Sequence, residues 1–292
     1  MRRPCKEIRR ILMQRRFAIL GFPLKHTMSP PIHKRLFELD GKDGEYLVYE
    51  IPPEDLEGKM PELNALDGYN VTIPHKISVI PFLDRLDETA KRYGAVNCVA
   101  NKNGELVGFN TDCLGFLRAL ESADIKLGGK VLLLGCGGAG RMMAIEAALS
   151  GAELSIAVRK GYEHEAQKVI SEIREMGCTS EIKILTLGEI DGAYDLLLNA
   201  TPVGMYPHVD ECPVPDEVIR NCTYVFDAVY NPVKTKLLQK AAAFGKKSVG
   251  GMAMLVWQAV AAHEIWDNSS YKISDVEDLI LKMEKQVMEN FK

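Results

Sequence analysis

A glycine-rich turn near the middle of the chain has the residue types and spacing that bind a dinucleotide. The sequence VLLLGCGGAGRMMAI reads as a buried strand, then Gly135-x-Gly137-x-x-Gly140, then a helix. The first glycine permits a tight turn, the second lets the backbone approach a pyrophosphate, and the third lets helix and strand pack closely. The anion then lies at the helix N-terminus, where N–H groups point at it. Because a strand precedes the glycines and a helix follows them, a turn without a ligand is the less favoured interpretation.

The end of the next strand, ELSIAV, indicates which dinucleotide is bound. An NAD site usually places Asp or Glu there to accept a hydrogen bond from the ribose 2′-hydroxyl. This chain has Val158-Arg159-Lys160 instead. Two cations suit a 2′-phosphate, and a guanidinium can also lie flat on the adenine. We therefore predict NADP(H) as the cofactor, with NAD(H) less favoured. The alternative, an ordinary surface charge at Arg159, stays open at this point.

A lysine in the first third of the chain is the second candidate for chemistry. In NVTIPHK, Val71 and Ile73 alternate with polar residues as in a half-buried strand, and Pro74 ends the strand just before Lys76. Such a lysine is either a solvated charge after a turn or a group held at the mouth of a pocket. The heptapeptide alone does not decide between them.

Runs of apolar residues predict the strands and helices that position these candidate residues. From 130 to about 230 the order is strand, helix, strand, helix, strand, strand, strand, which favours a parallel sheet covered on both faces. Earlier strands are expected at 17–22, 46–51 and 68–73, a hairpin at 95–110, and helices after Ser29 and over 84–92. Ser29 before Pro30 fits a helix N-cap with proline in the first turn.

Composition limits the class of protein. The chain has 292 residues, enough for one large or two medium domains. Its net charge of −4 gives no reason to expect nucleic acid as a partner, and no apolar run is long enough to span a membrane. Seven scattered cysteines without a C-x-x-C pair argue against a disulfide framework or zinc site and favour a reducing cytoplasm. Residues 1–16 are a basic extension, for which the sequence suggests no function.

Eight motifs, two of them already described, occur in a fixed order along the chain. They are HTMSP (26–30), NVTIPHK (70–76), AVN (95–97), GFNTD (108–112), LGCGGAG (134–140), NATPVGM (199–205), VYNP (229–232) and GGMAMLVWQA (250–259). As an ordered set, from about residue 17 to the C-terminus, they closely resemble shikimate dehydrogenase, in the shikimate/quinate dehydrogenase family. The resemblance implies two α/β domains: a substrate-binding domain (1–112 plus 251–292) with a mixed, mainly parallel sheet, and a Rossmann-type nucleotide-binding domain (113–250).

The same resemblance implies a set of site residues and a reaction. The family reduces 3-dehydroshikimate reversibly to shikimate with NADPH, a step in aromatic amino-acid biosynthesis, with no metal. Lys76 and Asp112 match its catalytic pair. Residues matching its substrate contacts are Thr27, Ser29, Thr72, Asn97, Tyr230 and Gln258. Residues matching its cofactor contacts, beyond those already named, are Gly138, Ala139, Asn199, Thr201, Met205 and Gly251.

These residue types suit the reaction. When hydride reaches a ring ketone, the developing alkoxide needs a proton, which an ammonium can stabilise and deliver. We expect Lys76 to donate the proton and Asp112 to orient it, although the immediate donor of the two is left open. Taken singly, Asp112 is more often a helix cap and Lys76 a solvated charge. His26 and His75 are left out as acid–base groups.

Two departures from the family pattern leave alternatives open. Thr27 stands where the family commonly has serine, which narrows the carboxylate pocket and keeps quinate open as a substrate. Val158-Arg159-Lys160 stands where NADP-dependent members commonly have Asn-Arg-Thr, which keeps NAD open. A regulatory protein that binds nucleotide without catalysis is a third alternative. The expected partners are a small-molecule substrate only, with neither nucleic acid nor membrane, and the chain is expected to be a monomer or homodimer.

Overall fold

The chain folds into two compact units, each built around its own six-stranded sheet. The computed structural model describes residues 15–25 and 27–290, so most of the basic extension and His26 fall outside it. The first unit runs up to Thr111 and takes in Gln258–Leu279, and the second comprises Asp112–Trp257 and the chain from Ile280 on. The predicted α/β fold class is confirmed, whereas the predicted domain limits and roles stay predictions.

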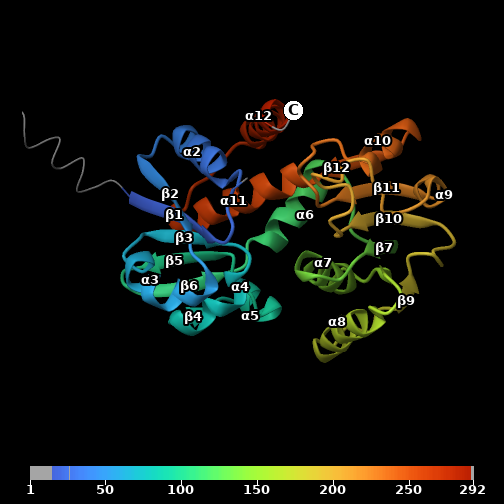
Figure 1. Ribbon diagram of the computed structural model, residues 1–292, viewed down its shortest axis with the longest axis horizontal. Helices are drawn as coiled ribbons and strands as arrows, with labels where there is room; N and C mark the ends of the chain where they lie inside the picture. The colour runs from blue at the N-terminus through green and yellow to red at the C-terminus, as the bar shows by residue number, and fades with distance from the viewer. Residues whose placement is uncertain (1–14, 26, 291–292) are drawn as a thin grey trace, which may run out of the picture. The chain divides into compact units, whose positions relative to one another are not determined.

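The first unit has a mixed sheet with strand order β2-β1-β3-β5-β6-β4 (Figure 1). Strands β1, β2 and β3 pair in parallel, β5 is antiparallel to both of its neighbours, and β4 pairs parallel to β6. The strands are β1 (Arg15–Gly21), β2 (Gly44–Glu50), β3 (Gly68–Val71), β4 (Arg85–Leu86), β5 (Cys98–Lys102) and β6 (Glu105–Phe109). The helices are α2 (Ser29–Asp40), α3 (Leu56–Leu63), α4 (His75–Ser78) and α5 (Glu88–Tyr93), with short 3-10 turns at Pro53–Asp55 and Ile80–Phe82.

Apolar side chains cover both faces of this first sheet. Helix α3 contributes Leu56, Met60 and Leu63 to the core on one face. On the other face Phe37 of α2 packs with Trp266 of α11 (Gly251–Asp267), whose indole N–H donates to the carbonyl of Val99 at 2.9 Å. These two layers fix the strand ends from which the site residues of this unit emerge.

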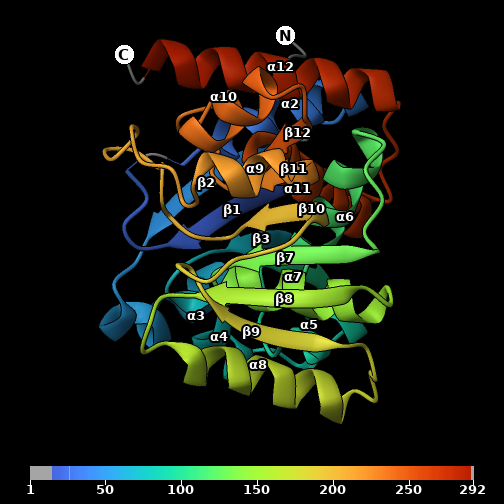
Figure 2. The ribbon, with the colours of Figure 1, turned by 90° about the vertical axis from the view of Figure 1, so that its right-hand side faces the viewer.

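The second unit has an all-parallel sheet with strand order β12-β11-β10-β7-β8-β9. In Figure 2 these strands follow one another from β12 near the top to β9 near the bottom. Its strands are β7 (Lys130–Leu134), β8 (Glu153–Val158), β9 (Ile182–Thr186), β10 (Tyr194–Asn199), β11 (Cys222–Asp227) and β12 (Lys247–Gly250). Its helices are α6 (Asp112–Ser122), α7 (Gly138–Leu149), α8 (Glu163–Glu175), α9 (Asp216–Arg220) and α10 (Lys236–Ala243), and α12 (Ile273–Asn290) belongs in part to each unit.

Both faces of the parallel sheet are buried, as its continuous apolar strands require. On one face Leu132, Leu197 and Val225 join a core with residues of α9 and α10. On the other face Phe226 meets Phe116 of α6 edge to face, with ring centroids 5.1 Å apart. Neighbouring residues 225 and 226 thus point to opposite faces, as strand geometry dictates.

Two local predictions are wrong. Residues 85–86 form a strand rather than part of a helix, because they pair with Val107 and Gly108 at the sheet edge. Helix α5 starts only after Asp87, whose carboxylate accepts a hydrogen bond from the Ala90 N–H at 2.8 Å. Met28, not Ser29, is the N-cap of α2, and its side chain forms no capping hydrogen bond at this helix end.

The described residues also bear on membrane, metal and disulfide sites. Within 15–25 and 27–290, no helix combines the length and apolarity needed to cross a bilayer, and no group of three or more His, Cys, Asp or Glu side chains has the geometry to hold a metal ion. None of the six cysteines in this part of the chain is disulfide-bonded.

Candidate functional site

The glycine turn of the second unit has the geometry that its spacing predicts. Gly135 follows β7 with φ +82°, a conformation that favours glycine, and a side chain there would also press on Thr201. A Cβ on Gly140 would overlap the backbone carbonyl of Gly135, so helix α7 packs on the turn only because this residue has none. In contrast, a Cβ on Gly137 or Gly138 would meet nothing within 4 Å. The turn is therefore closed on its protein side and open on its outer side.

The open side of the turn suits an anion. Gly137 is the N-cap of the 12-residue helix α7, and no acidic residue lies in the first helical turn, where Gly138 and Ala139 are exposed. The first N–H groups of a helix lack intrahelical partners and carry partial positive charge. Burial, helped by Glu165, raises the pKa of the Cys136 thiol, so the turn carries no thiolate at neutral pH. A diphosphate fits this arrangement.

A pocket of about 390 Å³ opens beside the glycine turn, at the carboxyl ends of the strands. This edge is where open parallel sheets bind ligands. The pocket is lined by Gly135, Cys136, Gly137, Ala157, Val158, Arg159, Tyr162, Glu165, Leu187, Ala200, Thr201, Pro202 and Val203. Arg159 is thus at the pocket, as its position after β8 predicts, whereas Lys160 is exposed and is not part of this lining. Most of these lining residues are apolar, and Arg159 brings a cation to the wall.

Several lining residues were not anticipated from the sequence. Tyr162 follows Gly161, whose φ of +90° turns the chain at the end of β8, and the Arg159 Cζ lies 4.6 Å from the Tyr162 ring centroid. Glu165 comes from the first turn of α8. The strand–turn–helix order around these residues was a usable signal, since the first helical turn after a strand borders the same edge of the sheet.

Asn199 and Thr201, both predicted as cofactor contacts, have different environments. Asn199 is fully buried at the end of β10. Its side-chain N–H donates to Asp227 at 2.9 Å, and its carbonyl oxygen accepts from the Thr201 hydroxyl at 2.7 Å. Asn199 therefore holds the loop that carries Thr201 to the pocket. Met205, further along this loop, is exposed.

Asp227 was not predicted and is the buried centre of this loop anchor. At the end of β11, its carboxylate accepts hydrogen bonds from the Thr235 hydroxyl at 2.5 Å and the Val229 N–H at 3.1 Å, in addition to the Asn199 contact. Burial nevertheless raises its pKa above the usual value. The signal was an acidic residue inside an apolar strand, which is rarely buried unless it is bonded.

Two predicted residues flank the same sheet edge. Gly251 begins α11, and a Cβ there would overlap the carbonyl of Ala228, so this position requires glycine for close packing. Tyr230, a predicted substrate contact, is partly buried, and this burial raises its pKa. Its hydroxyl therefore stays protonated and able to donate a hydrogen bond at neutral pH.

The first unit places polar side chains in a buried network at its sheet. Asn97, Thr111 and Gln258 are each less than a tenth exposed. The Asn97 side-chain oxygen accepts from the Thr111 N–H at 2.6 Å, and its N–H donates to the Thr111 hydroxyl at 3.0 Å and to Gln258 at 3.5 Å. Buried amides persist where they are bonded in this way. The network brings together two predicted substrate contacts, Asn97 and Gln258.

A second branch of the network leads to Ser29. Asn70 donates from its side chain to the carbonyl of Asn97 at 3.3 Å and accepts from the Tyr46 hydroxyl at 2.7 Å. The Tyr46 hydroxyl is also hydrogen-bonded to Ser29. Thr27 lies directly alongside, because its Oγ1 accepts from the Ser29 N–H at 3.3 Å. Asn70 and Tyr46 were not predicted, although a buried asparagine in an apolar strand was a visible signal.

Lys76 lies on the one-turn helix α4, just past the end of β3 and after Thr72, and is partly buried. Its backbone is tightly held. The Lys76 carbonyl accepts from the Val96 N–H at 2.7 Å, and the ring of the preceding His75 donates from Nε2 to the carbonyl of Ile51 at 2.7 Å. His75 is fully buried, so it anchors the turn that carries the lysine. Asp112, the other predicted catalytic residue, is partly buried at the start of α6 in the second unit.

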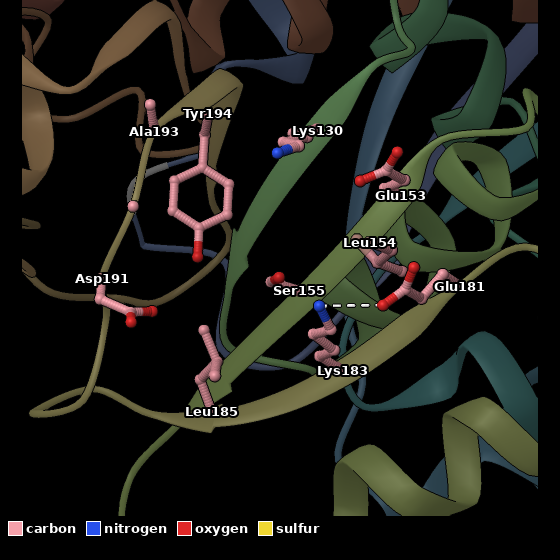
Figure 3. A pocket seen from close by; sticks show the side chains of 11 residues that line it. Lys130, Glu153, Leu154, Ser155, Glu181, Lys183, Leu185, Asp191, Ala193 and Tyr194 are labelled. Atoms are coloured by element: carbon pink, nitrogen blue, oxygen red, sulfur yellow. Dashed lines mark ion pairs between the residues drawn. The ribbon is translucent and has the colours of Figure 1, made fainter.

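Another hollow in the second unit differs in kind. It measures about 180 Å³ and lies where the strands begin, near Lys130, Glu153 and Tyr194 (Figure 3). Two of its charged side chains, Lys183 and Glu181, form an ion pair at 2.9 Å. The hollow therefore lies at the amino ends of the strands, whereas the glycine turn lies at their carboxyl ends. None of the predicted site residues line this hollow.

Comparison with known proteins adds an independent observation. Residues 19–99 match a family model described as the shikimate dehydrogenase substrate binding domain. A curated relative from Caldanaerobacter subterraneus subsp. tengcongensis, named shikimate dehydrogenase (NADP(+)), is 40% identical over 259 residues, which are 86% of this chain and 90% of the relative.

Solved structures agree with this match. Shikimate 5-dehydrogenase from Thermus thermophilus, in complex with NADP(H) and shikimate, is 34% identical with a TM-score of 0.81, covering 92% of this chain and all of that one. The enzyme from Listeria monocytogenes, in complex with shikimate and NAD, is 30% identical with a TM-score of 0.82, covering 91% of this chain and 96% of that one. The chain belongs to the shikimate dehydrogenase family.

Proposed function

We propose that this protein catalyses the reversible, NADP-dependent reduction of 3-dehydroshikimate to shikimate, a step toward the aromatic amino acids. The observation that carries the proposal is the bond between two motifs of the first unit. The Val96 N–H, directly before Asn97, holds the carbonyl of Lys76 at 2.7 Å. This bond makes the turn that carries Lys76 and the strand entry that carries Asn97 neighbours in the first unit, which supports assigning both residues to one substrate site.

The proton in this reaction is assigned to Lys76. A bound NADPH supplies hydride to the ketone carbon. The Lys76 ammonium stabilises the alkoxide that develops on the ketone oxygen and transfers a proton to it, which leaves a neutral amine that regains a proton from water. Asp112 is assigned to orient the lysine and the substrate hydroxyl. In the reverse direction, with oxidised cofactor bound as the hydride acceptor, the neutral amine of Lys76 takes the proton of the substrate hydroxyl.

The remaining polar residues are assigned to substrate binding. The hydroxyls of Thr27 and Ser29, assisted by Thr72, are proposed to donate to the substrate carboxylate. Neutral hydroxyls bind a carboxylate less strongly than an arginine fork does. The ring hydroxyls are assigned to Asn97 and Gln258, with Tyr230 as a further contact. The bonds of Asn97 to Thr111 fix its amide before substrate arrives, which reduces the entropy cost of binding.

The cofactor is assigned to the second unit. Gly137, Gly138 and Ala139 are proposed to hold the diphosphate through their backbone, with Gly135 and Gly140 shaping the turn. Arg159 is assigned to the 2′-phosphate, with Lys160 nearby. The fit rests on the open outer side of the turn and on the absence of acidic residues from the first turn of α7. Thr201 and Met205, on a loop anchored by Asn199, are assigned to the ribose and nicotinamide, and Gly251 to close packing nearby.

Quinate as a substrate and NAD as a cofactor form the second candidate function. Thr27 in place of serine favours a changed carboxylate pocket, and a relative of known structure was solved with NAD. Initial rates with shikimate and quinate, each with NADP⁺ and NAD⁺, separate the candidates. We expect the highest kcat/KM with shikimate and NADP⁺. An optimum with quinate and NAD⁺ would overturn the proposal, and NADPH binding without turnover in any of the four pairs would favour a regulatory protein.

The location and assembly of the protein are part of the same proposal. Thiol-form cysteines, six of them in the described residues, fit a reducing cytoplasm. The partners proposed are the substrate and cofactor alone. A monomer or homodimer is proposed, and sedimentation velocity on the purified protein distinguishes the two.

A further inference from the structure

The guanidinium of Arg159 lies over an aromatic ring inside the nucleotide pocket. Its Cζ is 4.6 Å from the centroid of Tyr162, and both residues line the pocket at the end of β8. We propose that Tyr162 determines cofactor specificity by holding Arg159 in place for the 2′-phosphate of NADP(H). This inference rests on the proposed function, because it assigns a further residue to the same cofactor site.

The local backbone is built to bring this ring under the arginine. Gly161, with φ +90°, reverses the chain between the two residues, and the Tyr162 N–H donates to the carbonyl of Arg159 at 3.0 Å. The Tyr162 carbonyl in turn accepts from the Glu165 N–H at 3.1 Å, in the first turn of α8. Because both ends of the turn are hydrogen-bonded, the backbone fixes the position from which the Tyr162 side chain extends to Arg159.

Stacking orders a guanidinium without neutralising it. An arginine ordered by a carboxylate gives its N–H groups and its charge to that partner. The carboxylate of this pocket, Glu165, pairs with Lys168 at 2.9 Å and with His164 at 2.8 Å. Among residues 15–25 and 27–290 no ion pair joins Arg159 to a carboxylate. The full positive charge of Arg159 therefore stays available to a phosphate.

The geometry also leaves the hydrogen-bonding edge of Arg159 accessible. Arg159 is exposed, and a guanidinium carries five N–H donors, so contact with one ring does not cover them all. A phosphate can approach the uncovered donors while Tyr162 restricts the rotation of the side chain. The free energy of a cation–π contact at an exposed site corresponds to a ratio of about two- to five-fold. This ratio limits how much the ordering of Arg159 by Tyr162 can add to the affinity for a 2′-phosphate.

The test compares two nucleotides that differ only in the 2′-phosphate. Adenosine 2′,5′-bisphosphate and adenosine 5′-monophosphate are titrated by calorimetry into the full-length protein and into the Tyr162→Leu, Tyr162→Phe and Arg159→Leu variants and the Arg159→Leu/Tyr162→Leu double variant. Tyr162 is half exposed, so its replacement is expected to leave the fold intact, and thermal unfolding checks this. The ratio of kcat/KM for NADP⁺ to that for NAD⁺ gives a second readout.

We expect Tyr162→Leu to lower the ratio of the two affinities by about two- to five-fold, through weaker binding of the bisphosphate. Tyr162→Phe keeps the ring and is expected to keep the ratio. In the Arg159→Leu background, Tyr162→Leu should have no further effect, because the partner is already gone. An equal loss for both nucleotides, or an undiminished effect without Arg159, would show that Tyr162 is only a wall of the pocket. A wild-type protein that binds both nucleotides equally would instead overturn the NADP assignment itself.

Discussion

The candidate sites of the two units consist of different groups, side chains in the first unit and mainly backbone in the second. In the first unit the site consists of side chains that bond to each other, with Asn97 at the centre and Thr111 and Gln258 around it. In the second unit the site consists mainly of backbone, because Gly137 and Gly138 present an open surface at a helix N-terminus. A side-chain site can match the pattern of hydroxyls on one small molecule, whereas a backbone site recognises the phosphate that many cofactors share.

This difference predicts how each site fails. A substitution in the side-chain site removes one specific donor or acceptor and leaves its partners unpaired. A substitution in the backbone site acts by adding atoms where the chain or the ligand must pass. The predictions that follow use this contrast, and they begin with the largest expected effect.

Lys76→Ala is expected to lower kcat by about 10²- to 10⁴-fold, since a positioned proton donor contributes about this much in the transition state. KM for shikimate should change little, because the interaction grows only as the alkoxide forms. Steady-state kinetics of shikimate oxidation measures both. Lys91→Ala, which removes an exposed lysine paired with Glu88, is the control and should leave both constants unchanged. A raised KM with unchanged kcat would contradict the catalytic assignment.

Two glycines of the turn form a matched pair. Gly140→Ala places a Cβ against the carbonyl of Gly135, so it should destabilise the fold by about 1–3 kcal/mol, as overpacking does, and weaken NADPH binding. Gly138→Ala meets nothing in the protein and replaces a helical glycine, so it should keep or raise stability by up to about 1 kcal/mol. Urea unfolding measures the stability of both variants, and calorimetric titration measures their affinity for NADPH.

The Gly138→Ala variant separates an effect on cofactor binding from an effect on folding. If Gly138→Ala folds well but binds NADPH several-fold more weakly, the added methyl group must collide with the cofactor rather than with the protein. Unchanged affinity would mean that the diphosphate does not approach this residue. Gly128→Ala, at another glycine with open space around it and outside the turn, serves as the control.

Asn97→Leu should destabilise the protein by about 1–3 kcal/mol, because it leaves the buried N–H of Thr111 without its acceptor. It should also raise KM for shikimate, because the amide assigned to the ring hydroxyls is lost. Urea unfolding and kinetics measure the two effects. Gln167→Ala, on the exposed surface of α8, is the control and should stay within about 0.5 kcal/mol of wild type. A stable variant with unchanged KM would remove Asn97 from the site.

The contrast between the two sites also explains what the sequence could predict. The glycine turn was predictable from local physics, since Gly135, Gly137 and Gly140 are required by one turn and by the elements next to it. Arg159 was predictable because a strand end fixes its place at the pocket. Tyr162 was missed because its contact with Arg159 depends on side-chain placement after the turn at Gly161, although the strand–turn–helix order already indicated a residue near the pocket.

The side-chain site was predictable only through family resemblance. Asn97 and Thr111 flank the β5–β6 hairpin, whereas Gln258 comes from helix α11 far along the chain, and only tertiary packing brings it to them. The prediction that Ser29 caps a helix was wrong because the helix already begins at Ser29, so that Met28 takes the cap position, while Ser29 interacts with Tyr46. Local rules describe Ser29 correctly as a hydroxyl at a helix start but cannot find its partner.

Acidic pH should act on the two units in opposite directions, with an effect of at most about 1.4 kcal/mol per pH unit for each group, reached only between its unfolded and folded pKa. In the first unit His33 and His263 are buried and share a hydrogen bond with an N–N distance of 3.0 Å. Burial lowers the pKa of His263 from 6.5 to about 3, and burial together with His263 lowers the pKa of His33. Below pH 6.5 these two histidines bind protons in the unfolded chain but stay neutral in the folded unit. The folding stability that is present above pH 6.5 is therefore lost as the pH falls.

In the second unit the sign reverses. Burial raises the pKa of Asp227, so the folded state takes up a proton at a pH where the unfolded state does not. This contribution to stability is present at low pH and is lost as the pH rises through the folded pKa. Hydrogen exchange at pH 7 and at pH 4, just above the ordinary pKa of 3.8 for Asp227, should show protection falling in β1–β3 relative to β10–β11 after correction for intrinsic rates. His263→Phe should reduce the fall in the first unit, and Asp227→Asn should remove the opposing trend in the second. A parallel loss in both units, unchanged by either substitution, would show that neither buried group governs the response.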